Sequence, residues 1–140
     1  MRVLAVDHGQ ARIGLAISDA GGRVARPLQA LAHVERAADA ARVAQLAAEH
    51  AAECIVLGLP KDGDGNIGPA ARRVQRFGAV LAEHTAIPVT YWDESNTTKR
   101  AAELSGRKRT ARPALDAIAA AIILQDYLDA HAHDAHPIAP

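Results

Sequence analysis

The chain has 140 residues, the size of one domain, and this excludes a two-domain enzyme with separate cofactor and substrate domains. Hydrophobic residues make up 49% and charged residues 23%, a globular composition, while an aromatic content of 3% excludes an aromatic-rich base-stacking sheet. Lysine and arginine total 16, as do aspartate and glutamate, so a basic surface for nucleic acid must be local.

The N-terminal third predicts three strands, at 3–6, 13–18 and 24–31. The pair Gly21-Gly22 predicts a tight hairpin turn between the second and the third. Pro27 cannot donate a backbone hydrogen bond, so the third strand is expected at an edge of the sheet.

The rest of the chain alternates between helical and strand patterns. A helix is predicted at 37–52, with Asp39 off its apolar face, and an uninterrupted apolar strand at 54–58. A helix beginning at Pro69 and ending near residue 84 follows, and then a strand at 88–92. Further elements are predicted at 96–104 (short helix), 105–112 (basic loop) and 113–130 (helix). This order predicts an α/β domain whose five-stranded mixed sheet is flanked by helices.

Three carboxylates stand apart from the solvated ones. Asp7 ends the first strand, Glu94 follows the last, and Asp116 lies among apolar residues near the start of the last helix. Carboxyl ends of parallel strands meet at one edge of a sheet, so Asp7 and Glu94 are expected there within metal-sharing distance, with Asp116 delivered by the overlying helix. The alternative is structural: an Asp at a strand end forms turns, and an Asp in a first helical turn complements the helix dipole.

Three carboxylates in one cleft repel one another unless cations lie between them. Mg²⁺ prefers hard oxygen ligands, and two ions about 3.5–4 Å apart can promote phosphodiester hydrolysis. The pattern therefore favours a metal-dependent phosphodiesterase.

Four segments together resemble the YqgF/RuvX family. The motifs are Asp7 to Asp19, a central block of Ile55 to Pro60 with Asp64-Gly65 and Gly68-Pro69, then Asp93 to Thr98, and Asp116 to Gln125. They occur in order and cover nearly the whole chain, short of a His-rich tail.

The resemblance implies an RNase H-like fold and a Mg²⁺- or Mn²⁺-dependent, two-metal-ion nuclease linked to maturation of pre-16S ribosomal RNA, hence to ribosome biogenesis. It also implies an older reading, a Holliday junction resolvase acting on branched DNA. The residues carried over as catalytic and metal-binding are Asp7, Glu94 and Asp116.

The sequence departs from the family pattern at several positions. His8 stands where the family more often has Tyr or Phe, and Ser95 and Asn96 replace an Arg-Leu pair. Alanines at 119 and 120 leave the last helix without a fourth carboxylate.

A basic segment precedes the last helix, and a phosphate-binding role there competes with a solvated loop. The expected nucleic-acid-binding residues are Arg12, Lys99, Arg100, Arg107, Lys108, Arg109 and Arg112. Gly9, in the first turn, and Thr97 and Thr98, which cap a helix or contact phosphate, are expected to support the site. Of Tyr91 and Trp92, one faces the core and the other is available to stack on a base, with core packing favoured for both.

Three functions remain open: cleavage of structured RNA, resolution of branched DNA, and non-catalytic RNA binding. A resolvase must place two symmetric cuts and should be a dimer, so monomer and homodimer are both expected states. The single Cys54 and the absence of a signal peptide or membrane span predict a cytoplasmic protein without a membrane partner. Residues 1–130 are expected to form one nuclease domain, and 131–140 a flexible polar tail whose histidines are unstructured rather than metal-bound.

Overall fold

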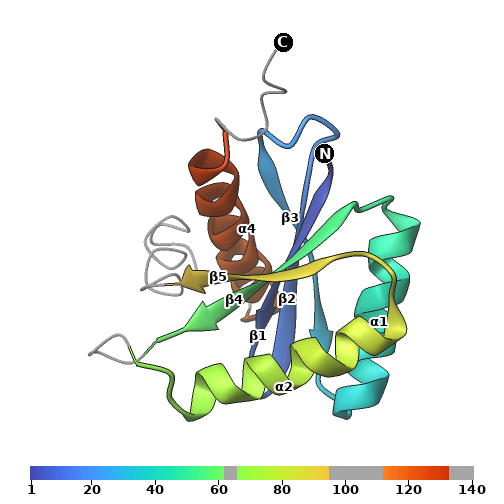
Figure 1. Cartoon of the computed structure of the whole chain (residues 1–140), viewed down its shortest axis with the longest axis vertical. Coiled ribbons are helices and arrows are strands. Elements are labelled where there is room, and N and C mark those ends of the chain that lie inside the picture. The colour runs from blue at the N-terminus through green and yellow to red at the C-terminus, as the bar shows by residue number, and fades with distance from the viewer. Residues whose placement is uncertain (62–65, 95–111, 133–140) are drawn as a thin grey trace.

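The computed structural model of this chain describes residues 1–61, 66–94 and 112–132. Its centre is a single five-stranded sheet with strand order β3-β2-β1-β4-β5 (Figure 1). The strands are β1 (Val3–His8), β2 (Arg12–Ser18), β3 (Ala25–Ala32), β4 (Cys54–Pro60) and β5 (Val89–Glu94). The helices are α1 (Arg36–Glu49), α2 (Pro69–His84) and α4 (Arg112–Ala130).

The predicted mixed sheet is confirmed. β1 pairs antiparallel with β2, where Asp7 lies opposite Gly14, and β2 pairs antiparallel with β3. β1 and β4 are parallel, as are β4 and β5. Asp19 and Val24 close the predicted β2–β3 hairpin with a backbone hydrogen bond of 3.1 Å, and β3, which contains Pro27, is an edge strand.

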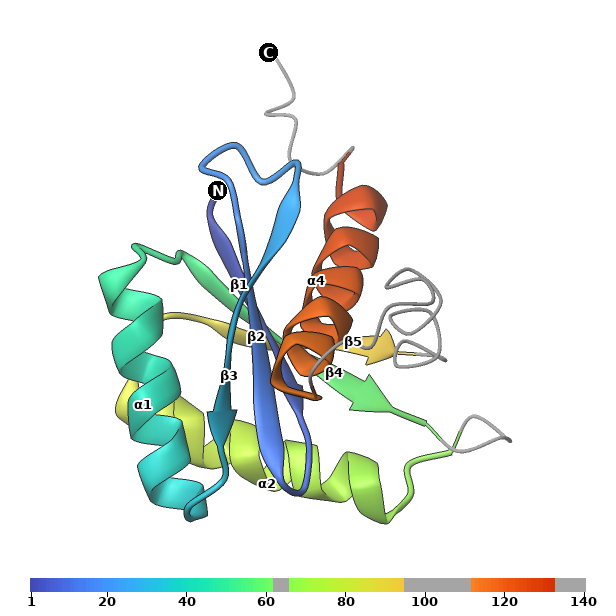
Figure 2. The ribbon, with the colours of Figure 1, turned by 180° about the vertical axis from the view of Figure 1, so that it is seen from behind.

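The two faces of the sheet carry different helices (Figures 1 and 2). Alternate residues of a strand point to opposite faces. Leu4 and Val6 therefore pack in the main core under α1 and α2, while Val3 and Ala5 pack against α4. Asp7 follows Val3 and Ala5 in this alternation, so its carboxylate lies on the α4 face of the sheet.

Helix α1 ends three residues before its predicted end. Ala52 N–H donates to the Ala47 carbonyl and Ala51 N–H to that of Ala48, at 2.9 and 3.1 Å. Ala51 has a φ of 56°, so the helix stops in a Schellman motif. Helix α2 begins at Pro69 and ends at His84, as predicted.

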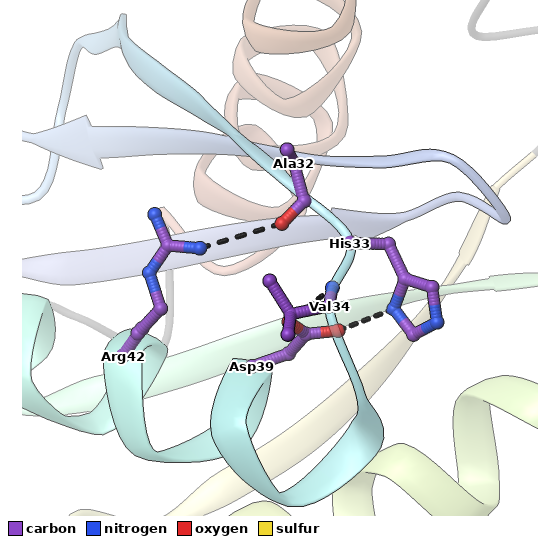
Figure 3. A network of polar contacts seen from close by, with 5 residues as sticks. All are labelled: Ala32, His33, Val34, Asp39 and Arg42. Atoms are coloured by element: carbon purple, nitrogen blue, oxygen red, sulfur yellow. Dashed lines mark hydrogen bonds and ion pairs between the residues drawn. The ribbon is translucent and has the colours of Figure 1, made fainter.

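The expectation that Asp39 lies off the buried face of α1 is wrong, because Asp39 is fully buried. Its carboxylate accepts hydrogen bonds from Val34 N–H at 3.1 Å and from His33 Nδ1 at 2.5 Å (Figure 3). Arg42 Nη1 donates to the Ala32 carbonyl at 3.3 Å beside this pair. The helical period predicts only which face of the helix is apolar. The hydrogen bonds of Asp39 connect the β3–α1 segment to the helix and provide the donors that a buried carboxylate needs.

Several predicted elements lie outside the described residues: the helix at 96–104, most of the loop at 105–112, and the tail from 133 onward. Within the part that is described, no helix has the length and apolarity needed to cross a membrane.

Candidate active site

The three carboxylates come from three elements that meet on the α4 face of the sheet. Asp7 is the penultimate residue of β1, Glu94 is the last residue of β5, and Asp116 lies in the first turns of α4. Asp7, Glu94 and Asp116 are all partly buried.

Two glycines allow the other two carboxylates to approach Asp7. A Cβ on Gly14 would overlap the backbone carbonyl of Asp116, so the bare β2 backbone lets α4 pass directly over it. A Cβ on Gly58 would lie 2.5 Å from Glu94 Oε2 and 2.7 Å from Ile123 Cδ1. This packing role of Gly14 and Gly58 is not expected from the sequence motifs, although glycine inside a strand is itself a signal of close approach.

The charges of the three carboxylates act on one another through Asp7. Burial, and after it the negative charge of Asp116, raises the pKa of Asp7 from 3.8 to about 6. Burial, and after it the charges of Asp7 and Asp93, raises the pKa of Glu94 from 4.5 to about 7. Asp116 therefore acts on Asp7 and Asp7 on Glu94, which indicates that Asp7 is the central member of the three.

Asp116 also has a cationic partner. Arg12 Nε donates to Asp116 Oδ2 at 2.7 Å, and both side chains are about one third exposed, at 34% and 27%. No group of three or more His, Cys, Asp and Glu side chains within residues 1–61, 66–94 and 112–132 is close enough to hold a metal ion. The described side chains therefore do not form a closed three-carboxylate cluster, and Arg12 is the counter-ion of Asp116.

The donor chemistry nonetheless suits a hard divalent cation. Asp7 and Glu94 offer carboxylate oxygens in a partly buried position, and no described lysine or arginine forms an ion pair with either. A divalent ion would offset the repulsion that raises both pKa values. Asp7 would be the shared ligand, with Glu94 on one side and Asp116 on the other.

The remaining candidate residues are distributed unevenly. Gly9 N–H donates to the Arg12 carbonyl at 3.0 Å and closes the β1–β2 turn, which positions Arg12. Arg112 is the first residue of α4. The other candidates lie outside the described residues: Thr97, Thr98, Lys99, Arg100, Arg107, Lys108 and Arg109.

His8 belongs to the other face of the sheet. Its ring stacks on Phe77, with centroids 4.4 Å apart, and burial, followed by the charge of Arg73, lowers the pKa of His8 to about 4. His8 is therefore neutral at pH 7 and packs under α2, away from the carboxylates.

The preference for core packing of both Tyr91 and Trp92 is wrong for Tyr91, which is 38% exposed on edge strand β5. Trp92 points to the opposite face and packs against Tyr127 of α4.

The fold is that of the RuvC resolvases, RNase H-like enzymes. Thermus thermophilus RuvC in complex with a Holliday junction superposes with a TM-score of 0.61 at 18% identity, over 95% of this chain and 96% of that one. The fowlpox virus Holliday junction resolvase gives a TM-score of 0.58 at 15% identity, over 93% and 99%.

Residues 1–130 match the RuvX family, described as Holliday junction resolvase, and the chain belongs to this family of nucleases. A relative from Chloroflexus aurantiacus is 44% identical over 91% of this chain and 86% of its own length. One from Heliobacterium modesticaldum is 37% identical over 95% and 92%. Both carry a name that proposes a pre-16S rRNA nuclease.

Proposed function

We propose that this chain is a Mg²⁺- or Mn²⁺-dependent nuclease that cleaves structured RNA and processes pre-16S ribosomal RNA in the cytoplasm. One observation carries the proposal. Asp7 lies between two other carboxylates, and burial and repulsion raise its pKa to about 6 and that of Glu94 to about 7. Such an arrangement is costly for folding without a cation, and strongly perturbed acids concentrate at functional sites.

We assign the roles by position. Asp7, the central carboxylate, would hold the metal ions together with Glu94 and Asp116. Two divalent ions bound there would supply an activated nucleophile and stabilise the leaving oxygen in phosphodiester cleavage. Gly14 and Gly58 keep the carboxylates close, because any side chain at either position would displace Asp116 or Glu94.

Arg12 is proposed to contact the substrate. It is partly exposed beside Asp116, and an arginine guanidinium can bind a phosphate oxygen as well as a carboxylate. The basic residues between Lys99 and Arg112 are proposed to extend this phosphate-binding surface along the chain that precedes α4.

Structured RNA is the preferred substrate because the relatives that match nearly the whole chain carry a pre-16S rRNA nuclease name. Resolution of branched DNA is the second candidate, favoured by the family's description and by the likeness to RuvC. A resolvase needs two active sites on one junction. A dimer in solution that binds a four-way junction would favour the second candidate, and a monomer would favour the first.

The test compares wild type with Asp7→Asn and Glu94→Gln on a pre-16S RNA fragment and on a four-way DNA junction. Removal of a group that only supports a metal ligand lowers activity roughly 10–100-fold. We expect both variants to lose more activity than this. Binding measured by anisotropy should remain near wild type. Asp129→Asn, an exposed acid on α4, is the matched control and should cleave normally.

Two results would contradict the proposal. Cleavage by Asp7→Asn at the wild-type rate would remove Asp7 from the site. A wild-type protein that binds RNA but cleaves neither substrate with Mg²⁺ or Mn²⁺ would instead support a non-catalytic RNA-binding module.

A further inference from the structure

Three rings form an aromatic cluster where β5 meets the C-terminal half of α4. Tyr127 and His131 stack with centroids 4.1 Å apart, and Trp92 meets both with its edge, at 5.6 and 5.4 Å. All three are partly exposed. The whole chain has only one Trp, two Tyr and one Phe, so two of its four large aromatic residues gather here.

The cluster lies on the same face of the sheet as the carboxylates and is joined to them by rigid elements. Trp92 precedes Glu94 by two residues on β5, about 7 Å along the strand, and points the same way. Tyr127 follows Asp116 by three turns of α4, about 16 Å, and lies on the same side of that helix. Figures 1 and 2 show α4 running across this face of the sheet beside β5.

Other contacts hold the rings of this cluster in place. Tyr127 lies within side-chain hydrogen-bonding reach of the Cys54 thiol on β4, and this contact opposes the rise in the pKa of the thiol that burial causes. His131 Nδ1 donates to the Tyr127 carbonyl at 2.8 Å, one turn back along the chain. These two contacts hold the rings of Tyr127 and His131 in place, and the cluster offers ring surface to a ligand.

A cavity of about 180 Å³ opens beside the cluster. It is lined by Met1, Val3, Gly21, Gly22, Tyr127, Leu128 and His131. None of these lining residues has an Asp, Glu, Lys or Arg side chain, and the N-terminal ammonium of Met1 donates to the Ala20 carbonyl at 2.9 Å. Its volume is below the range of about 300–1,000 Å³ that holds drug-sized ligands, so it suits one flat ring system better than a whole nucleotide.

We infer that the aromatic cluster and this cavity bind an unpaired nucleobase of the substrate strand, close in sequence to the phosphate that is cut. The inference rests on the proposed function, because the position of the cluster matters through its distance from Glu94 and Asp116. Bases of any identity stack on aromatic side chains, and a cavity lined mainly by apolar and aromatic side chains favours a base over a phosphate. The cluster would then select substrates with a single-stranded stretch next to the cleavage position.

Trp92 makes the inference directly measurable, since it is the chain's only tryptophan. The full-length protein is titrated in EDTA, so that no cleavage occurs, while Trp92 emission and the anisotropy of a labelled strand are followed. The probes are an oligoribonucleotide, its DNA counterpart, a blunt RNA duplex and inorganic polyphosphate. We expect both single strands to quench the emission of Trp92. The strand that binds more tightly identifies RNA or DNA as the preferred source of the base. Polyphosphate should leave the emission unchanged.

His131→Ala tests the contact itself, and His84→Ala is its matched control. His84 also stands at the end of a helix and bonds the carbonyl one turn back, Val80, at 2.9 Å. We expect His131→Ala to weaken single-strand binding about five-fold or more and His84→Ala to have no effect. His131→Phe, which keeps a ring, should restore the affinity.

The outcomes separate this inference from the proposed function. Tight single-strand binding with unchanged Trp92 emission, or equal affinities for His131→Ala and His84→Ala, would overturn the base site and leave the nuclease intact. Absence of binding to any nucleic acid would overturn both.

Discussion

Arg12 and Asp116, 104 positions apart in sequence, form the ion pair that joins the start of β2 to the start of α4. The guanidinium Nε lies 2.7 Å from Asp116 Oδ2. The pair has two consequences: Asp116 has a counter-ion when no metal is bound, and its charge still raises the pKa of neighbouring Asp7. The site thus combines one balanced carboxylate with two that repel each other.

Arg12→Gln should lower the free energy of unfolding by about 0.5–1 kcal/mol at pH 7 in EDTA, the range of a partly exposed ion pair. Saturating Mg²⁺ should shrink this difference, because a cation then balances Asp116 in place of Arg12. Urea denaturation with and without Mg²⁺ measures both values. Arg42→Gln, whose arginine bonds the Ala32 carbonyl on the other face of the sheet, should give a difference that Mg²⁺ leaves unchanged. A Mg²⁺-independent loss in Arg12→Gln would show that the pair is only structural.

The raised pKa values predict that the metal-free protein loses stability as the pH rises. The folded protein holds protons on Asp7 and Glu94 that the unfolded chain releases at about pH 4, so their stabilising effect is complete below that pH. It is lost as the pH rises through about 6 for Asp7 and about 7 for Glu94. The loss is on the order of 3 kcal/mol for each group.

Asp7→Asn should remove its share of this dependence. Urea denaturation in EDTA at pH 4, 5.5 and 7.5 measures the free energy of unfolding of both proteins. The value for the variant should rise relative to that for wild type as the pH rises, and Mg²⁺ should abolish this relative increase. A constant difference between the two proteins across this range would mean that Asp7 does not titrate there.

Gly14→Ala should destabilise the protein by about 1–3 kcal/mol and reduce cleavage, since the added Cβ overlaps the backbone of Asp116. Thermal unfolding and the cleavage assay report the two effects. Gly21→Ala is the control, because its Cβ would make an ordinary contact with Asp19 at 3.7 Å. Equal behaviour of the two variants would contradict the close packing of α4 on β2.

Asp39→Ala should cost about 2–3 kcal/mol, because it leaves the Val34 N–H without its acceptor and removes the partner of His33. Denaturation midpoints measure the loss. Glu49→Ala, an exposed acid on the same helix, should change stability by no more than about 0.5 kcal/mol. A loss in Asp39→Ala as small as that of Glu49→Ala would show that the two hydrogen bonds do not hold the β3–α1 connection.

The sequence by itself determined the order of the described elements, the mixed directions of the strands and the edge position of β3. Short-range signals carry that information: apolar runs for β1 and β4, the Gly21-Gly22 hairpin, Pro69 at the start of α2, and the edge-strand signal of Pro27. The motifs that contain Asp7, Glu94 and Asp116 also placed three carboxylates on elements that converge. Each of these signals lies within a few neighbouring residues, where backbone geometry is decided.

The tertiary structure alone decided which side chains meet. The angle at which α4 crosses the sheet pairs Asp116 with Arg12, brings its backbone onto Gly14 and carries Tyr127 to Trp92. Asp39 is buried because the β3–α1 connection folds back over it, against the helical pattern. Such contacts join residues far apart in sequence, so they follow from how whole elements pack and are absent from any local period.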